Sequence, residues 1–115
     1  MSENAGLVAR CDRRGNAVVV VVGGELDIDS ADELRAVLGG PEAQAPMVIL
    51  DLRQLRFMDS SGLSIVVEAH KRAKAGGSRF VVATGGATAV QRLLDLSGLR
   101  ETLAIAESPD EVLSG

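Results

Sequence analysis

The run AVVVVV at residues 17–22 decides the fold class of this chain. Valine is β-branched and favours strands, and an apolar run without polar alternation indicates a strand that is covered on both faces. The preceding segment, Leu7 to Cys11, is short and mildly apolar, and RRGN at residues 13–16 has the composition of a turn. These segments therefore predict a β-hairpin whose second strand lies inside the sheet.

Three later runs have the same buried character as the valine run. The segments MVILDL and FVVA predict two further strands, and LAIA predicts a weaker one. They occupy residues 47–52, 80–83 and 103–106.

Helical patterns lie between these strands and after the last of them. The first helix begins with a predicted capping box, in which Ser30 accepts the backbone N–H of Glu33 and the glutamate side chain reaches back. The third is predicted to end at Gly98, because glycine readily adopts the left-handed conformation that terminates many helices. The four predicted helices begin near Ser30, Ser60, Ala87 and Pro109, and the first three end near Leu38, Ala75 and Ser97.

Buried strands joined by helices of this length pair in parallel through right-handed crossovers. We therefore expect an α/β fold: one domain over residues 1–115, with a mixed, mostly parallel sheet that starts with a β-hairpin and is covered by about four helices. A chain of 115 residues can bury one core without metal or disulfide staples. We expect the first few residues to be flexible.

Composition excludes several classes of function. Aromatic residues are only 2% and the net charge is −4, which disfavours base-stacking and phosphate-backbone binding. The single cysteine, Cys11, excludes an internal disulfide framework and a Cys-based zinc site. The chain shows no signal-peptide pattern and no apolar run near the roughly 20 residues of a membrane helix. We therefore expect a soluble, cytoplasmic protein that binds neither nucleic acid nor membrane.

The segment FMDSSGL, residues 57–63, is the strongest site candidate. Asp59, Ser60 and Ser61 are all residue types that cap helices, and a single helix end does not need three of them. Gly62 costs roughly 1 kcal/mol relative to alanine in a first helical turn, unless something approaches its backbone closely. A helix N-terminus also suits a phosphoryl group. From the residues alone, phosphate chemistry and plain capping remain equally open.

A second candidate is the loop at residues 23–29, which follows the valine strand and by itself indicates a glycine turn. Loops at the carboxyl ends of parallel strands share one edge of an α/β sheet. If the two strands are neighbours, Asp27 and Ser60 therefore lie near each other.

Catalytic alternatives have weaker signals. His70 is the only histidine and lies about 15 Å along the same helix from Ser60, too far for a Ser–His pair. Gly85-Gly86 lacks the residues of a nucleotide-binding loop. The basic cluster near Lys71 and Arg72 indicates a solvated helix face, with Glu68 as an i,i+4 partner. We expect no catalytic residue, metal site or cofactor.

Five motifs occur in a fixed order along the chain. They are GELD at residues 24–27, SA at 30–31, LDL at 50–52, FMDSSGL at 57–63 and VQRLLDLSGL at 90–99. Together they closely resemble the STAS-domain anti-sigma factor antagonists of bacteria, over nearly the whole chain.

The resemblance implies a partner-switching protein rather than an enzyme. In that family the unphosphorylated antagonist binds an anti-sigma factor, a serine kinase of the histidine-kinase-like ATPase type, and so frees a sigma factor. The kinase phosphorylates the serine that matches Ser60, and a PP2C-type phosphatase reverses this. Asp27 and Asp59 match acidic positions beside the phosphoserine, with Ser61 adjacent, and Gly62 lets the partner approach.

Two other classes of function remain open at this point. One is an interaction module of the same fold that is never phosphorylated. The other is a small nucleotide-binding enzyme that uses the glycine turns.

Overall fold

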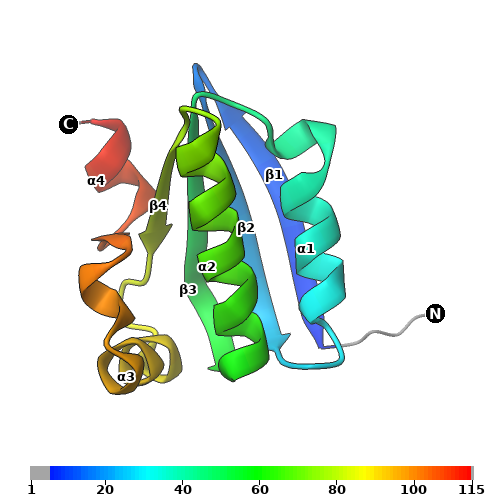
Figure 1. Ribbon diagram of the computed structural model, residues 1–115, viewed down its shortest axis with the longest axis vertical. Helices are drawn as coiled ribbons and strands as arrows, with labels where there is room; N and C mark the ends of the chain where they lie inside the picture. Colours follow the sequence, from blue (N-terminus) through cyan, green and yellow to red (C-terminus); the bar gives the residue numbers. More distant parts are fainter. Residues whose placement is uncertain (1–5, 115) are drawn as a thin grey trace.

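The computed structural model describes residues 6–114, which form one five-stranded sheet in the order β1-β2-β3-β4-β5 (Figure 1). β1 and β2 are antiparallel, and the other neighbours are parallel. This confirms the predicted α/β fold with an N-terminal hairpin whose second strand is interior. The expected flexibility of the first few residues concerns positions outside the described residues. The strands are β1 Leu7–Arg14, β2 Ala17–Leu26, β3 Met47–Met58, β4 Arg79–Ala83 and β5 Ala104–Ala106.

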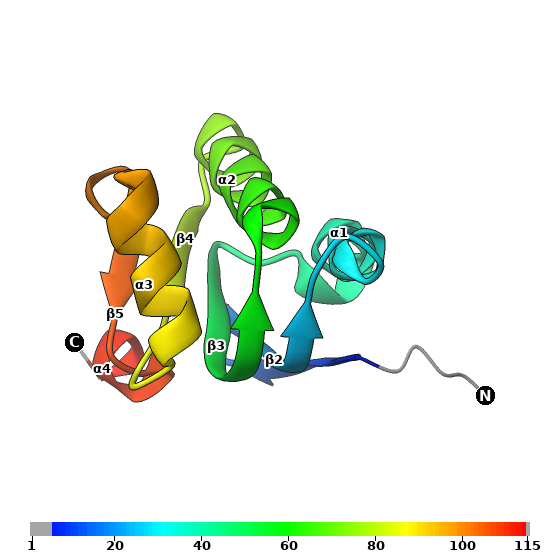
Figure 2. The same ribbon diagram turned by 90° about the horizontal axis from the view of Figure 1, so that it is seen from below.

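Helices cover both faces of the sheet. Helices α1 and α2 lie side by side on one face, and α4 lies on the other (Figures 1 and 2). Helix α3 packs against β3 at the lower end of the molecule in Figure 1. The four α-helices of the described residues are α1 Ala31–Gly39, α2 Ser60–Ala75, α3 Thr88–Ser97 and α4 Pro109–Leu113.

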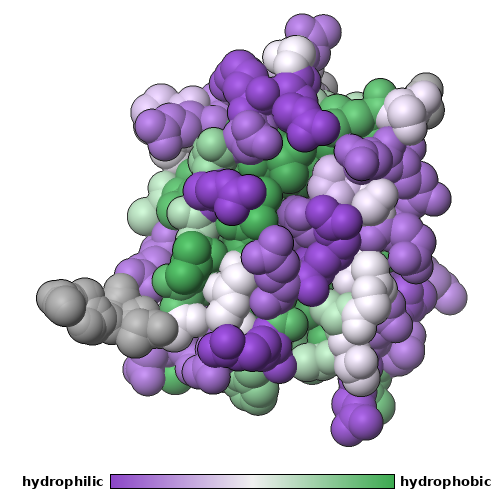
Figure 3. Space-filling model, turned by 180° about the vertical axis from the view of Figure 1, so that it is seen from behind, coloured by the Kyte–Doolittle hydropathy of each residue, from purple (hydrophilic) through white to green (hydrophobic). Residues whose placement is uncertain are grey.

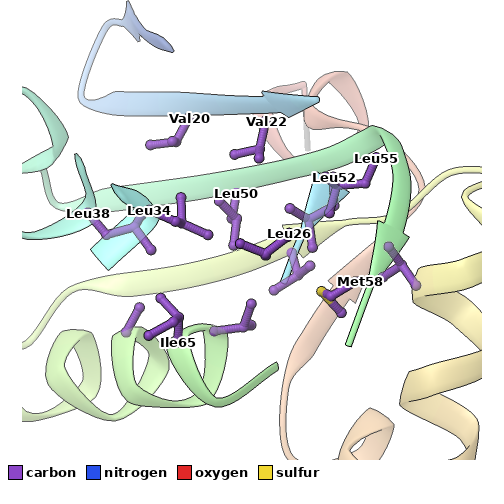
Figure 4. Packing of buried hydrophobic residues seen from close by; sticks show 14 of the residues in the cluster. Val20, Val22, Leu26, Leu34, Leu38, Leu50, Leu52, Leu55, Met58 and Ile65 are labelled. Atoms are coloured by element: carbon purple, nitrogen blue, oxygen red, sulfur yellow. The ribbon is translucent and has the colours of Figure 1, made fainter. Parts of the chain in front are cut away.

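The valine strand supplies both sides of the core, as its uninterrupted apolarity predicts. Val18, Val20 and Val22 belong to the main cluster, which packs beneath the helices (Figure 4). Val19 and Val21 belong to a smaller cluster on the opposite face, against which α4 packs. Both faces of β2 are therefore buried, which fixes its place inside the sheet.

Strand β3 is longer than the sequence predicts, because it continues past Leu52 to Met58. Its first five residues pair with both β2 and β4, whereas the later part pairs with β2 alone. Of residues 53–57 only Leu55 is buried, so the extension lacks the continuous apolar run of a central strand. The extension is what carries β3 to the start of α2.

The capping box predicted at Ser30 is wrong. Ser30 is the N-cap residue of α1, but its side chain makes no cap hydrogen bond. Its hydroxyl instead donates to the Glu25 carbonyl and accepts from the Asp27 N–H, both at 3.0 Å. The loop before α1 therefore competes with the helix for this serine. A related pattern occurs at α4, where Ser108 Oγ accepts the Glu111 N–H at 3.2 Å and the Glu111 carboxylate accepts the Glu107 N–H at 2.8 Å.

An ion pair between a buried carboxylate and an exposed arginine lies at the end of the central part of β3. The Asp51 residue is 2% exposed, and the Arg53 guanidinium donates to both of its carboxylate oxygens, at 2.9 and 3.0 Å. The hydrogen bond to Asp51 raises the pKa of Arg53 above its ordinary value. The arginine stem packs over Gly85, where a Cβ atom would lie 2.8 Å from Arg53 Cγ. The sequence patterns did not predict this ion pair, although Asp51 lies in the LDL motif at residues 50–52.

Candidate functional site

The carboxyl ends of β2 and β3 lie side by side, as Figure 2 shows in a view along the sheet. Leu26 pairs with Met58 in the parallel register, and the Asp59 N–H donates to the Leu26 carbonyl at 3.2 Å. Asp27 directly follows Leu26, and Asp59 directly follows Met58, so the two aspartates come directly after neighbouring positions of the sheet. The predicted meeting of the two loops at one sheet edge is confirmed, and Ser60 begins α2 at the same edge.

Asp59 alone caps α2. Its Oδ1 atom accepts the backbone N–H groups of Ser61 at 2.9 Å and Gly62 at 3.3 Å. Within residues 6–114 the Ser60 hydroxyl has no hydrogen-bond partner, and Ser60 is exposed, whereas Ser61 is half-buried. Plain capping thus accounts for Asp59 and leaves an accessible hydroxyl in the first turn of the helix.

Gly62 is buried beneath this first turn. A Cβ atom there would lie 2.6 Å from Leu26 Cγ and 3.0 Å from Met58 Cγ. Figure 4 shows the Leu26 and Met58 side chains close together at this end of the core. The close approach expected at Gly62 is therefore made by Leu26 of the same chain. The glycine seats α2 on the ends of the two strands.

We expect Gly62→Ala to destabilise the protein by about 2 kcal/mol, because the added methyl group overpacks a buried contact. Gly86→Ala is the matched control, since nothing lies within 4 Å of a Cβ atom at that position. Urea unfolding of both variants measures the difference. Equal stabilities of the two variants would contradict the packing role of Gly62.

The Asp27 carboxylate orders the loop between β2 and α1. Its Oδ1 atom accepts the N–H groups of Asp29 and Ser30 at 3.1 and 3.2 Å, and it lies 3.2 Å from the Ser30 hydroxyl oxygen. Ile28, at the tip of this loop, is 74% exposed. Asp27 therefore has a structural task and also places a negative charge at the edge that holds Ser60.

Ser60 lies at a shallow groove of about 500 Å³ on the outer face of α2. Leu63, Val67 and Leu99 supply its apolar lining, and Glu68 and Lys71 supply charged groups. The groove therefore places apolar surface next to the free Ser60 hydroxyl.

The structure keeps His70 away from this site. The His70 ring is half-buried and packs edge-on against Phe80, with ring centroids 6.5 Å apart. Its Nδ1 atom is buried without a hydrogen-bond partner in the described part of the chain. Because ten residues of one helix span about 15 Å, the predicted separation of His70 from Ser60 is confirmed.

The other residues considered in the sequence do not form a second functional site in the described part of the chain. Arg72 pairs with Glu68 at 3.0 Å, as the i,i+4 spacing predicts. Burial raises the pKa of the Cys11 thiol, which lowers its reactivity at neutral pH. Among residues 6–114 no cluster of three or more His, Cys, Asp or Glu side chains could hold a metal ion. No helix in that range has the length and apolarity to cross a membrane.

Comparisons with known proteins agree on one family. The STAS domain family model matches residues 9–112. The anti-sigma F factor antagonist of Paenibacillus polymyxa is 31% identical over 99 residues, 84% of each chain. The anti-sigma-F factor antagonist RsfB of Mycobacterium tuberculosis is 30% identical over 109 residues, 94% of this chain and 87% of that one. A crystal structure of an anti-sigma factor antagonist from Mycobacterium paratuberculosis superposes with a TM-score of 0.86 at 25% identity, covering 99% and 97% of the two chains.

Proposed function

The chain belongs to the STAS domain family, and from this membership we propose that it is an anti-sigma factor antagonist controlled by phosphorylation of Ser60. In the unphosphorylated state it binds an anti-sigma factor, a serine kinase of the histidine-kinase-like ATPase type, and so releases a sigma factor. A PP2C-type phosphatase restores this state, and the cycle takes place in the cytoplasm. The names of the two curated relatives support the antagonist role.

The observation that carries this proposal is the free hydroxyl of Ser60. It is exposed, and no group in residues 6–114 bonds to it. Asp59 already caps the helix, so modification of Ser60 does not remove a cap. ATP held by the kinase supplies the phosphoryl group: the Oγ–P bond replaces the bond to ADP, and the hydroxyl proton passes to the kinase.

Electrostatics explain how the modification stops binding. A phosphoryl group adds about −1.5 to −2 charges at an edge that already holds Asp27 and Asp59. The positive end of the α2 dipole offsets only about 0.3 to 1 kcal/mol of the resulting repulsion. A partner that covers Ser60 must therefore desolvate a dianion among carboxylates, and binding weakens without refolding of the domain.

We expect the kinase to modify Ser60 and not Ser61. Ser60→Ala should abolish phosphorylation, and Ser61→Ala should leave it in place, because Ser60 is exposed whereas Ser61 is half-buried. The test incubates each variant with ATP and each anti-sigma factor kinase of the same organism, followed by intact-mass measurement and phosphopeptide mapping.

Each alternative class predicts a different result in this experiment. Self-labelling or ATP turnover without the kinase would indicate a nucleotide-binding enzyme. Absence of phosphorylation by every kinase would indicate an interaction module that is never modified. Mapping of the phosphate to Ser61 would overturn the assignment of the site.

A further inference from the structure

Exposed apolar side chains and arginines alternate on a surface next to the Ser60 edge. Three of the four large hydrophobic residues that are exposed in the described chain lie here: Val8 at 68%, Phe57 at 45% and Leu96 at 78%. We call this surface the basic-apolar strip. It consists of Val8, Arg10, Arg56, Phe57, Arg92 and Leu96.

Two hollows that share Arg56 make the strip continuous. One, of about 330 Å³, lies on the sheet face turned away from α1 and α2 and is lined by Val8, Arg10 and Arg56. The other, of about 460 Å³, lies between β3 and α3, and its lining includes Phe57, Arg92 and Leu96. Figure 3 shows the sheet face turned away from α1 and α2, where apolar surface is exposed between polar side chains.

The charges of the strip are largely uncompensated within residues 6–114. Arg10 and Arg92 form no ion pair with any described residue. Arg56, whose side chain is 75% exposed, approaches Glu25 only to 3.9 Å. By contrast, the guanidinium groups of Arg72 and Arg100 hold carboxylates at 3.0 and 2.8 Å. The chain has a net charge of −4, whereas the strip carries a local positive charge.

We propose that the basic-apolar strip docks an acidic, apolar-bearing segment of the anti-sigma factor, and this inference rests on the proposed function. Arg56 and Phe57 belong to β3 and lie only three and two residues before Asp59. One partner can therefore cover both the strip and Ser60. Guanidinium groups bind carboxylates with directional hydrogen bonds, and the two hollows accept apolar side chains. The acidic groups of the partner lie over the arginines.

The strip also gives the phosphorylation switch a second component. Partner carboxylates that the arginines attract in the unmodified state are repelled by a dianion on Ser60. The same acidic segment therefore senses both states of the protein. Because the apolar residues line discrete hollows between the arginines, we favour a protein segment over an anionic lipid surface as the occupant.

The test is a calorimetric titration of the anti-sigma factor with the full chain, at low and high salt. Arg56→Glu/Arg92→Glu should weaken binding about 10- to 100-fold and reduce its salt dependence. Lys74→Glu/Arg79→Glu is the matched control, because it changes the net charge equally at exposed positions outside the strip. Phe57→Ser/Leu96→Ser should weaken binding at both salt concentrations. Circular dichroism establishes that each variant is folded.

The outcomes separate this inference from the proposed function. If Ser60→Asp weakens binding while both strip variants behave like the control, the strip is not the docking surface and the phosphorylation switch still stands. If unmodified protein binds no anti-sigma factor, both proposals fail. If the strip arginines are needed only for binding to vesicles that contain anionic lipid, the strip recognises lipid and the protein-docking proposal is overturned.

Discussion

The Ser60-phosphorylated protein is expected to bind its anti-sigma factor about 100-fold more weakly than the unmodified protein, a loss of about 3 kcal/mol. The reason is the edge formed by β2 and β3, where Asp27 and Asp59 follow paired residues beside Ser60. A dianion placed there must be desolvated among like charges when the partner covers it.

Four forms of the protein test this expectation by calorimetric titration against the nucleotide-bound kinase. Ser60→Ala keeps the site neutral and should bind at least as well as the unmodified protein. Ser60→Asp adds one charge without the bulk of a phosphate, so its affinity should fall between those of the unmodified protein and the phosphoprotein. If the phosphoprotein and Ser60→Ala bind equally well, electrostatic control at this edge is excluded.

The acidic neighbours give a second measure of the same effect. Asp27→Asn keeps an oxygen that can accept the hydrogen bonds of the loop, and Asp59→Asn keeps one for the cap of α2. Both variants should therefore stay folded while the charge beside Ser60 decreases. We expect phosphorylation to weaken binding less in these variants than in the wild type.

Arg53→Met is expected to destabilise the fold by about 3 kcal/mol, because it leaves the buried Asp51 carboxylate without its charged partner. The Asp51 side chain is only 3% exposed, whereas Arg53 is 43% exposed, so the loss should lie at the lower end of the range for buried pairs. Arg100→Met is the matched control, because Arg100 holds Asp95 at 2.8 Å on the surface, where such pairs contribute less than about 1 kcal/mol.

Urea unfolding at neutral pH compares the two arginine variants directly. The free energy of unfolding should fall clearly more for Arg53→Met than for Arg100→Met. Asp51→Asn/Arg53→Met, which removes both charges, should recover part of the loss. Equal losses for the two single variants would show that burial of Asp51 does not set the strength of its ion pair.

The parts of the fold that sequence predicted correctly are those fixed by short-range patterns. The bounds of α2, Ser60–Ala75, agree with the prediction. Gly98 has a φ of +75°, in the left-handed region that ends α3. The valine run placed β2 inside the sheet, because an interior strand needs apolar residues on both faces.

The errors arise where tertiary contacts override local patterns. Ser30 fits a capping box, yet the Asp27 loop binds its hydroxyl, and no local rule ranks these two partners. The segment RQLRF at residues 53–57 interrupts the apolar run and so indicates the end of a strand, whereas pairing with β2 extends β3 through it. The resemblance implied that a partner approaches Gly62, but in the folded chain Gly62 is buried and the close neighbour is Leu26.

The Asp59 cap determines how a phosphate on Ser60 is presented. The N–H groups of Ser61 and Gly62, which a phosphoryl group in the first turn could otherwise bind, already donate to Asp59 Oδ1. In the proposed phosphorylated form, a phosphate on Ser60 would therefore leave the Asp59 cap of the helix in place. Because Ser60 is exposed, we expect this phosphate to project into solvent, where a partner protein can contact it. We therefore expect phosphorylation and dephosphorylation of Ser60 to change the free energy of unfolding of the domain little.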